Sequence, residues 1–419
     1  MKGQTSPDRQ KIEVVLTNHE RTKHHLHRYA RSLGYLDWAT QPDPFRTYEG
    51  APKIPLSRNL RGWGKPYDAL HLPWGEGEPL SLETLGVFFR LALGLSAWKA
   101  FGEHRWALRC NPSSGNLHPT EGYALLPTIP GIEGGVYHYV SRDHLLEARC
   151  TIPPERRDRW NDLFTPGGFG VGLSSIHWRE AWKYGERAYR YCQLDVGHAI
   201  GSIGYAAAVL GWRIHLLDTP GDDDIEALLG LEREEDFRRC GEVEREAPDL
   251  LLLVTTGRER SPFEARLDEA IDIVRHGRWQ GAANALSPDH FFWEQIEVVA
   301  QAARKPRTPS LPPPVGEKLP PPQGTSRCNA VELILQRRSA VAMDGRRTIP
   351  RERFHAILDR LLPRPRIFPW AALPWQPRIH PVFFVHRVEG LPAGLYLLER
   401  DPSVGVPLRR AIRGSVRWE

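Results

Sequence analysis

The segment from Arg109 to Glu121, RCNPSSGNLHPTE, concentrates residues that can hold a ligand. Its centre is the run Pro112, Ser113, Ser114, Gly115 and Asn116. A turn of this composition presents consecutive backbone N–H groups, two hydroxyls and a carboxamide, which can bind an anionic or heteroaromatic ligand through fixed dipoles. The same composition also makes ordinary surface loops, so the turn by itself leaves both interpretations open.

A second chemical candidate is the pair Lys183 and Tyr184 in the run WKYGERAYRY. A lysine can remove a proton from carbon only if burial or a cationic neighbour favours its neutral form. Arg179, Arg187 and Arg190 are close enough in the sequence to be such neighbours. The tyrosine can hydrogen-bond a substrate or orient the amine. The alternative is that Lys183 extends into solvent from the end of a helix.

The cysteines and histidines show no spacing typical of a metal site. Five cysteines are scattered along the chain: Cys110, Cys150, Cys192, Cys240 and Cys328. None forms a CxxC pair, so we expect no disulfide framework, no cysteine zinc site and a reducing, cytoplasmic location. Cys110, beside the turn, is interpreted as a packed thiol. Four histidines cluster near the N-terminus and are interpreted as an exposed helix face without metal: His19, His24, His25 and His27.

Length and charge limit the classes of protein that fit. The 419 residues suggest more than one domain. The net charge of +5 is small and spread along the chain, so no basic stripe indicates nucleic-acid binding. No run approaches the roughly 20 uninterrupted apolar residues of a membrane helix. The N-terminus also lacks the apolar core of a secretory signal. We therefore expect no nucleic-acid and no membrane partner.

A proline-rich segment divides the chain. Residues 306–322, PRTPSLPPPVGEKLPPP, contain eight prolines, so they should run as extended polyproline II. The predicted organisation is a helical extension at 1–44, a first domain at 45–303, a linker at 304–326 and a partial second domain at 327–419.

Hydrophobic periodicity in the first domain predicts both helices and strands. The predicted elements are a helix over 82–93 capped by Ser81, a hairpin from 122–127 and 135–140, a long helix over 190–212 and a buried strand over 250–256. The long helix carries a stripe of small residues at Gly197, Gly201, Gly204 and Ala208. That stripe fits either a buried core helix or a close helix–helix contact between two halves.

The second part of the chain resembles a shortened copy of the first. FRTYEGAPKIPL from Phe45 is echoed by RRSAVAMDGRRTIPRERFHAILDRLL from Arg337, and GGVYHYVSRD at 134–143 by AGLYLLERD at 393–401. The first pair shares a basic residue, a small or hydroxylic one, an Ile-Pro step and a later amphipathic helix. We therefore expect an α+β fold with one full copy and a partial second copy.

Together these motifs resemble the nitroreductase superfamily of flavin-dependent α+β enzymes, and within it the SagB/ThcOx-type dehydrogenases. The resemblance spans much of residues 18–212, and Arg337–Ser339 extends it past the linker. It rests on NHERTKHHLHRYARSLGYLDWATQPDPFRTYEGAPKIPL, RCNPSSGNLHPTEGY and WKYGERAYRYCQLDVGHAIGSIGYAAAVLGW. It implies a nitroreductase-like fold with FMN bound at the interface of two halves.

The resemblance also implies which residues hold FMN. An Arg-Arg-Ser segment of one half contacts the phosphate and ribityl chain, and the Pro-Ser-Ser turn of the other half lies near the isoalloxazine ring. The corresponding positions here are Arg337, Arg338 and Ser339 on one side, with Arg109 and residues 112–116 on the other. Guanidinium groups bind phosphate bidentately, and an amide-rich turn suits the edge of the ring.

The azoline-oxidising members of this family carry a Lys-Tyr pair, and Lys183 and Tyr184 match it. The implied reaction is dehydrogenation of a thiazoline or oxazoline in a modified peptide, with hydride passing to flavin and dioxygen reoxidising it. Two alternatives stay open. One is an NAD(P)H-dependent reductase of nitro compounds or quinones, and the other is a scaffold that binds a peptide or partner without turnover.

The second copy stops short of the first. It has no counterpart of the long helix at 190–212 or of the strand ending at Gly257, and of a reciprocal flavin site only Arg46 remains. We therefore expect one flavin site per chain. A homodimer contact or a partner subunit would complete the second half.

Overall fold

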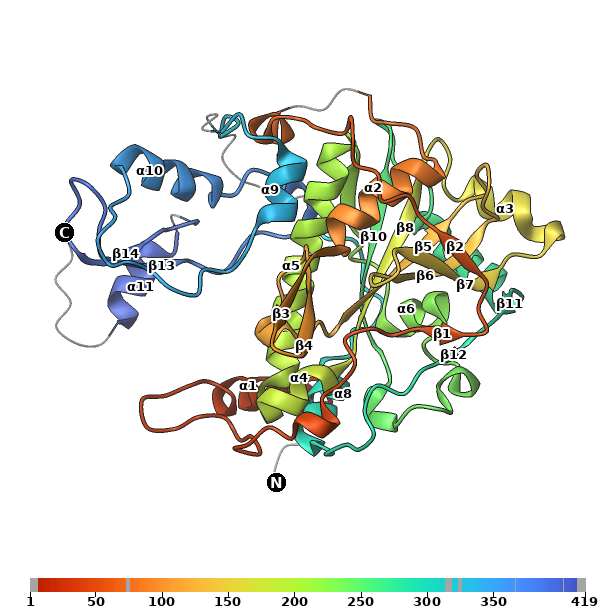
Figure 1. Ribbon diagram of the computed structural model, residues 1–419, viewed down its shortest axis with the longest axis horizontal. Coiled ribbons are helices and arrows are strands. Elements are labelled where there is room, and N and C mark those ends of the chain that lie inside the picture. The colour runs from red at the N-terminus through yellow and green to blue at the C-terminus, as the bar shows by residue number, and fades with distance from the viewer. Residues whose placement is uncertain are drawn as a thin grey trace.

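An eight-stranded antiparallel sheet forms the centre of the protein (Figure 1). The computed structural model describes residues 7–72, 76–312, 319–322, 326–365, 367–401 and 403–412. The strand order is β11-β7-β6-β5-β8-β10-β9, and β2 also pairs with β7. The bounds are β2 (Lys53–Pro55), β5 (Thr120–Leu126), β6 (Gly135–Val140), β7 (Leu145–Thr151), β8 (Gly168–Ser175), β9 (Arg213–Leu216), β10 (Ala247–Thr255) and β11 (Arg278–Trp279).

Helices surround this sheet, and shorter strand pairs lie outside it. The helices are α1 (Pro7–Arg21), α2 (Leu82–Ala92), α3 (Arg157–Asp162), α4 (His177–Tyr184), α5 (Ala188–Val209), α6 (Asp222–Leu229), α7 (Leu267–Arg275), α8 (Glu294–Ala303), α9 (Ala330–Gln336), α10 (Arg351–Arg360) and α11 (Gly405–Ala411). The strand pairs are β1 (Tyr48–Glu49) with β12 (Ala282–Ala283), β3 (Leu95–Phe101) with β4 (His104–Arg109), and β13 (Val382–Val385) with β14 (Gly394–Leu397). The mixed α+β class is as predicted.

The predicted elements of the first part are present with shifted ends. The hairpin forms from β5 and β6, which pair antiparallel. The long helix is α5, and the buried strand is β10. The helix α2 begins as predicted, because the Ser81 hydroxyl accepts the Thr84 N–H at 3.2 Å while the Thr84 hydroxyl accepts the Ser81 N–H at 2.9 Å. This reciprocal pair satisfies two backbone donors that the first turn would leave unbonded.

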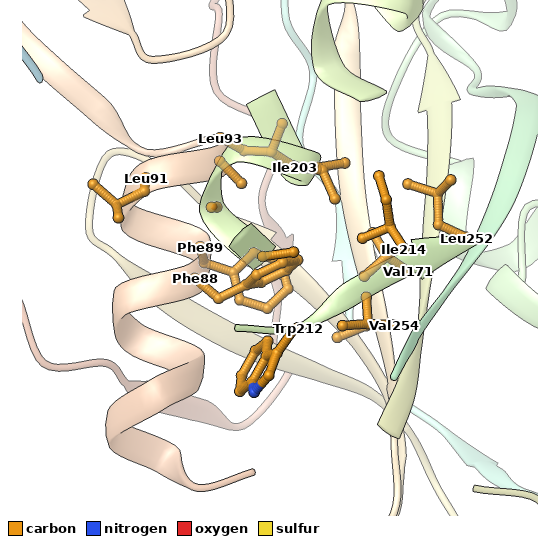
Figure 2. Packing of buried hydrophobic residues seen from close by; sticks show 14 of the residues in the cluster. Phe88, Phe89, Leu91, Leu93, Val171, Ile203, Trp212, Ile214, Leu252 and Val254 are labelled. Atoms are coloured by element: carbon orange, nitrogen blue, oxygen red, sulfur yellow. The ribbon is translucent and has the colours of Figure 1, made fainter. Parts of the chain in front are cut away.

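Both faces of the sheet are covered, so its central strands are buried throughout. Successive side chains of a strand point to opposite faces. In β10, Leu250, Leu252 and Val254 pack toward the α2 and α5 side, whereas Leu251 and Leu253 pack toward the α6 and α7 side. Figure 2 shows Phe88 and Phe89 of α2 gathered with Trp212 beside Val254 and Val171 on the first of these faces.

The second part of the chain lies beside the first at one edge of the molecule, at the left of Figure 1. Its first helix, α9, packs against α2 and β3. Farther along, α10 and the antiparallel hairpin of β13 and β14 form a small cluster around Phe354, Val385 and Val388, whereas Phe368 and Ala372 pack with the core of the first part. The division into four domains stays a prediction.

The start of the proline-rich segment is fastened to the first part of the chain. Arg304 pairs with Glu226 at 2.7 Å, and Arg307 pairs with Asp224 at 2.6 Å, so both arginines hold α6. The Thr308 hydroxyl donates to the Asp218 carbonyl at 2.8 Å. Residues 313–318 and 323–325 of the predicted linker lie outside the described residues.

The stripe of small residues on α5 faces the second part of the chain rather than another helix. A methyl group added at Gly204 would lie 2.1 Å from the ring of Phe368, whereas one added at Gly197 or Gly201 would meet nothing within 4 Å. Phe368 is buried between the rings of Tyr205 and His71.

Among the described helices, none combines the length and hydropathy needed to cross a bilayer.

We expect Phe368→Ala to lower the free energy of unfolding by about 3–5 kcal/mol, because it removes a buried aromatic ring that joins the two parts. Urea unfolding followed by circular dichroism measures the change. The control is Phe384→Ala, since Phe384 is 73% exposed. Equal effects of the two substitutions would show that the Phe368 contact does not stabilise the protein.

Candidate active site

The turn at residues 113–116 is held in place by a carboxylate from the long helix. Asp195 of α5 is 1% exposed. Its carboxylate accepts the Ser114 N–H at 3.0 Å and the Ser114 hydroxyl at 2.9 Å. Burial raises the pKa of Asp195, and its hydrogen bonds from Ser113 and Ser114 oppose that rise. A buried carboxylate is tolerated only when donors surround it, so turn and helix depend on each other.

Further bonds fix the shape of the turn. The backbone φ is positive at Gly115, Asn116 and His118. The Ser113 hydroxyl accepts the His118 N–H at 2.8 Å, and the Asn116 amide donates to the Ala107 carbonyl at 2.9 Å. The amide oxygen of Asn116 lies 3.0 Å from His118 Nε2, which therefore carries the proton. Burial, together with two nearby arginines, lowers the pKa of His118 well below its ordinary value, so the ring is neutral.

Lys183 and Tyr184 lie directly over this turn. A methyl group added at Gly115 would come 2.6 Å from Tyr184 Oη and 3.2 Å from Lys183 Nζ. Both side chains are half-buried, and Lys183 Nζ is 5.4 Å from the centre of the Tyr184 ring. Burial raises the pKa of Tyr184 to about 12, so its hydroxyl is a proton donor at neutral pH. The structure thus brings the two sequence motifs into one site.

The cationic neighbours that we expected for Lys183 have other partners. Arg179 is buried, donates to the His118 carbonyl at 2.8 Å and pairs with Glu121. Although burial alone would raise it, this pairing holds the pKa of Glu121 at about 2. Arg187 and Arg190 bond to the end of α1 and the residue that follows it: Arg190 to the His19 carbonyl at 2.7 Å and Arg187 to the Thr22 carbonyl. Each of these arginines is thus bonded to a group other than Lys183, and its action on Lys183 stays a prediction.

A buried carboxyl group, Glu180, is the neighbour that sequence reasoning missed. Glu180 is fully buried, and neither carboxyl oxygen has a hydrogen-bond partner among the described residues. Burial raises the pKa of Glu180 well above its ordinary value, and Asp195 adds to the rise while Lys183 opposes it. The group is therefore a neutral acid beneath the turn. The available signal was its spacing, because residues three apart share one face of a helix.

The Arg-Arg-Ser segment follows α9 and reaches the beginning of the turn. Arg337 Nη2 donates to the Cys110 carbonyl at 3.4 Å. Arg338 bonds to the Leu335 carbonyl at 2.7 Å, and Arg337, Arg338 and Ser339 are all exposed. Burial raises the pKa of the Cys110 thiol to about 11, with both arginines opposing the rise. Two segments far apart in the sequence therefore meet at the Cys110 carbonyl just before the turn, where Arg337 makes the contact while Arg338 bonds to the carbonyls of Leu335 and Arg337.

Arg109 and Arg46 lie inside the protein rather than at this surface. Arg109 donates to the Thr120 carbonyl at 3.1 Å and to the Pro44 carbonyl, and burial lowers its pKa to about 10. Arg46 is 1% exposed and pairs with Glu246 at 3.4 Å. Neither guanidinium is positioned to reach a ligand at the turn, so we leave both out of the site proposed below.

The N-terminal histidines do not form the predicted helix face. Only His19 lies on α1, which ends at Arg21, and His24, His25 and His27 follow it in an irregular segment. Arg21 anchors the end of that helix through Glu186 at 2.6 Å. Propagation of the helix beyond Arg21 would have been needed for a continuous face.

Comparison with known proteins finds sequence similarity over part of this chain. No protein-family model matches it. It is 31% identical over 148 residues to the trifolitoxin-processing protein TfxB of Rhizobium leguminosarum, covering 32% of this chain and 38% of TfxB. It is 25% identical over 158 residues to the nitroreductase-like protein MJ1384 of Methanocaldococcus jannaschii, covering 36% of this chain and 75% of MJ1384. The matched region thus spans well under half of TfxB.

A solved structure agrees with these relatives. The crystal structure of a nitroreductase-like protein from Anabaena variabilis superposes with a TM-score of 0.59 and 20% identity, over 92% of this chain and 76% of that one. This chain has the nitroreductase fold and is related to the nitroreductase superfamily. The resemblance inferred from the sequence motifs is confirmed at that level.

The neutral state of Glu180 predicts a pH-dependent stability difference. A carboxyl whose pKa is raised by folding stabilises the protein fully below about pH 4.5, and that contribution is lost as pH rises toward the folded pKa. The loss is about 1.4 kcal/mol for each pH unit in that window. Glu180→Gln has no such titration. We therefore expect its free energy of unfolding to rise relative to the wild type as the pH increases above about 4.5.

Urea unfolding at several pH values measures this difference. Glu352→Gln is the matched control, because Glu352 is exposed on α10. Parallel pH curves for the wild type and Glu180→Gln would contradict the neutral buried acid.

Proposed function

We propose that this nitroreductase-fold protein is an FMN-dependent oxidoreductase of the SagB type that dehydrogenates an azoline ring in a modified peptide. One observation carries the proposal: Lys183 and Tyr184 lie over Gly115 of the Pro-Ser-Ser turn, while Arg337 bonds to the carbonyl of Cys110, two residues before Pro112. The name of the relative TfxB, a trifolitoxin-processing protein, supports a peptide-modifying role. The nitroreductase-like relative MJ1384 supports oxidoreductase chemistry.

The residues at this surface fit a flavin mononucleotide. Arg337 and Arg338 are exposed and can bind the phosphate, with Ser339 next to them. Tyr184 Oη and Lys183 Nζ lie against Gly115, which has no side chain of its own. Half-buried Pro112, Ser113, Ser114 and Asn116 beside it can offer backbone, hydroxyl and amide groups to the edge of a flat ring. When bound, the flavin would supply the hydride acceptor for the oxidation.

The chain's own residues would then move the proton. Lys183 Nζ takes the proton from the ring carbon as the C–H bond breaks, and Tyr184 donates a hydrogen bond to a heteroatom of the ring. Lys183 forms no ion pair with the described residues, so no carboxylate engages its amine.

We expect purified protein to be yellow and to release FMN on denaturation, identified by its mass. The double variant Arg337→Ala/Arg338→Ala should bind FMN about 10- to 100-fold more weakly, because its charged hydrogen bonds to the phosphate are lost. Titration of FMN fluorescence measures the affinity. Arg346→Ala is the control, since Arg346 is exposed in the same part of the chain. Protein that stays colourless with added FMN would instead favour a binding scaffold.

We expect Lys183→Ala to slow azoline oxidation by about 10²- to 10⁴-fold, the usual contribution of a positioned base, without releasing FMN. A synthetic peptide with one thiazoline is the substrate, and mass spectrometry detects the loss of a hydrogen pair. Lys53→Ala, at an exposed lysine of β2, is the matched control.

Quinone reduction by NADH, measured on the same variants, separates the two enzymatic hypotheses. Unchanged thiazoline oxidation in Lys183→Ala would overturn the assigned role of Lys183. Rapid quinone reduction together with no thiazoline oxidation by the wild type would favour the NAD(P)H-dependent reductase.

A further inference from the structure

A second cavity, of about 630 Å³, lies on the other side of the α4–α5 pair from the turn. It is lined by the start of α4, the first turns of α5, and parts of α6, β10 and α8. Gln193 lines this cavity, whereas Asp195 holds the turn. Residues two apart on a helix point in nearly opposite directions, so the cavity and the proposed active site are separate.

The cavity is strongly acidic. Its carboxyl groups without an ion pair among the described residues are Asp222, Glu232, Glu242, Asp249 and Glu297. Of the arginines in its wall, Arg304 is paired with Glu226 and Asp223, and Arg245 makes one bond to a carbonyl, at 3.4 Å. Unpaired carboxylates facing one cavity repel each other, and a bound cation relieves that repulsion.

A nearly buried histidine in the same wall also lacks a partner. His177 is 9% exposed, lines the cavity and forms no hydrogen bond with the described residues. Its ring meets Tyr189 edge-on at 5.7 Å. Burial lowers the pKa of His177 to about 4, so the imidazole is neutral and offers one donor and one acceptor. A polar group left unbonded at this depth indicates a ligand or solvent partner.

The arrangement of these carboxyl groups suits an organic cation better than a bare metal ion. Among the described residues, no three His, Cys, Asp or Glu side chains are arranged to hold a metal. The carboxyl groups are instead spread over a cavity large enough for an ammonium or guanidinium group with its alkyl chain. Each can accept a charge-assisted hydrogen bond from such a group.

An apolar groove of about 780 Å³ opens next to the acidic cavity. The two share Gln193, Asp222 and Asp249. Three parts of the chain form the apolar wall of the groove: α5, the segment between β9 and α6, and the second part of the chain. The residues of this wall include Ile200, Leu217, Trp370, Leu373 and Trp375. Gly197 and Gly201 leave this wall without side chains, which keeps the groove open.

We infer that the cavity and groove together bind a peptide segment, with a lysine or arginine side chain among the carboxylates of Asp249 and Asp222 and apolar neighbours along Trp375. The charge of the cavity selects the basic side chain, and the groove selects the residues beside it. This binding requires neither the flavin nor the azoline reaction, so it is tested independently of them.

Asp249 makes this binding pH-dependent. Its carboxylate accepts the Ser175 hydroxyl at 2.6 Å and the Gln193 amide at 3.4 Å, which fixes it at the floor of the cavity. Burial raises the pKa of Asp249 to about 7, and the negative charge of Asp222 on α6 adds to the rise. The carboxyl is therefore ionised above about pH 7, where a basic side chain should bind more tightly.

The other titratable groups around Asp249 do not reverse this sign. The Tyr189 phenol and the Cys192 thiol, both on α5, sense its charge, and burial raises the pKa of each above its ordinary value. Both are neutral near pH 7. His177 is neutral as well, and Lys305 acts on Asp222 from the rim.

The test is binding of a fluorescein-labelled hexapeptide, one lysine flanked by leucines, to the full chain by fluorescence anisotropy. A matched peptide with glutamine in place of lysine, and spermidine as an unlabelled competitor, separate the peptide from a simple polyamine. We expect the lysine peptide to bind at least about tenfold more tightly than the glutamine peptide, since one charge-assisted contact is lost. We also expect its affinity to increase between pH 6 and pH 8 because Asp249 ionises near pH 7.

Substitutions assign the contacts. Asp249→Asn should weaken the lysine peptide about tenfold and abolish the pH dependence. Glu297→Gln, at an exposed residue of α8 that lines the cavity, should weaken it as well. Trp375→Ser should weaken the peptide without affecting spermidine. Glu352→Gln is the control. Equal affinity for the two peptides, or an unchanged affinity in both Asp249→Asn and Glu297→Gln, would overturn the proposal; spermidine that competes as strongly as unlabelled peptide would overturn the assignment to a peptide.

Discussion

The position of the candidate site depends on one buried carboxylate. Asp195 holds the backbone and the hydroxyl of Ser114, and in doing so it sets the distance between the turn and the helix α5. Burying a charge costs free energy unless donors compensate for it, so the helix can keep Asp195 only if the turn stays in this place. Everything that approaches the turn, including the end of α4, is positioned relative to that contact.

The bend between α4 and α5 is the second feature that positions the candidate site. Gly185 ends α4 with φ +54°, and a side chain there would meet the Arg31 carbonyl at 2.4 Å. Only glycine tolerates that conformation and that approach. The bend directs Lys183 and Tyr184 back over the turn, while the two helices enclose Glu180. The same helix pair presents His177, Tyr189 and Gln193 on its other side, so it contributes residues to both the candidate site and the acidic cavity.

The sequence predicted the local elements and motifs better than the contacts between them in three dimensions. Capping by Ser81, the β5–β6 hairpin and the long helix follow from short-range patterns, and each is present. The turn and the Lys-Tyr pair were also visible as motifs. Their contact was not derivable from spacing, because it depends on how α4 packs on the turn in three dimensions.

The surroundings of Lys183 show why spacing along the chain was not enough. We expected arginines close in the sequence to be its neighbours, but a buried guanidinium bonds to the carbonyls and carboxylates that the fold brings to it, as Arg179 does with the His118 carbonyl and Glu121. Glu180 looked like any charged residue of an amphipathic helix. Its burial is a property of the surrounding fold, which no local pattern contains.

The bond between Arg337 and the Cys110 carbonyl is made within a single polypeptide. Segments that belong to separate molecules come apart when the solution is diluted, whereas covalently joined ones keep an effective local concentration in the millimolar range at any dilution. The pairs of Arg304 with Glu226 and of Arg307 with Asp224 fix the start of the proline-rich segment on α6. The encounter between the two parts is thus a folding event of one chain, and its occurrence is independent of how much protein a cell makes.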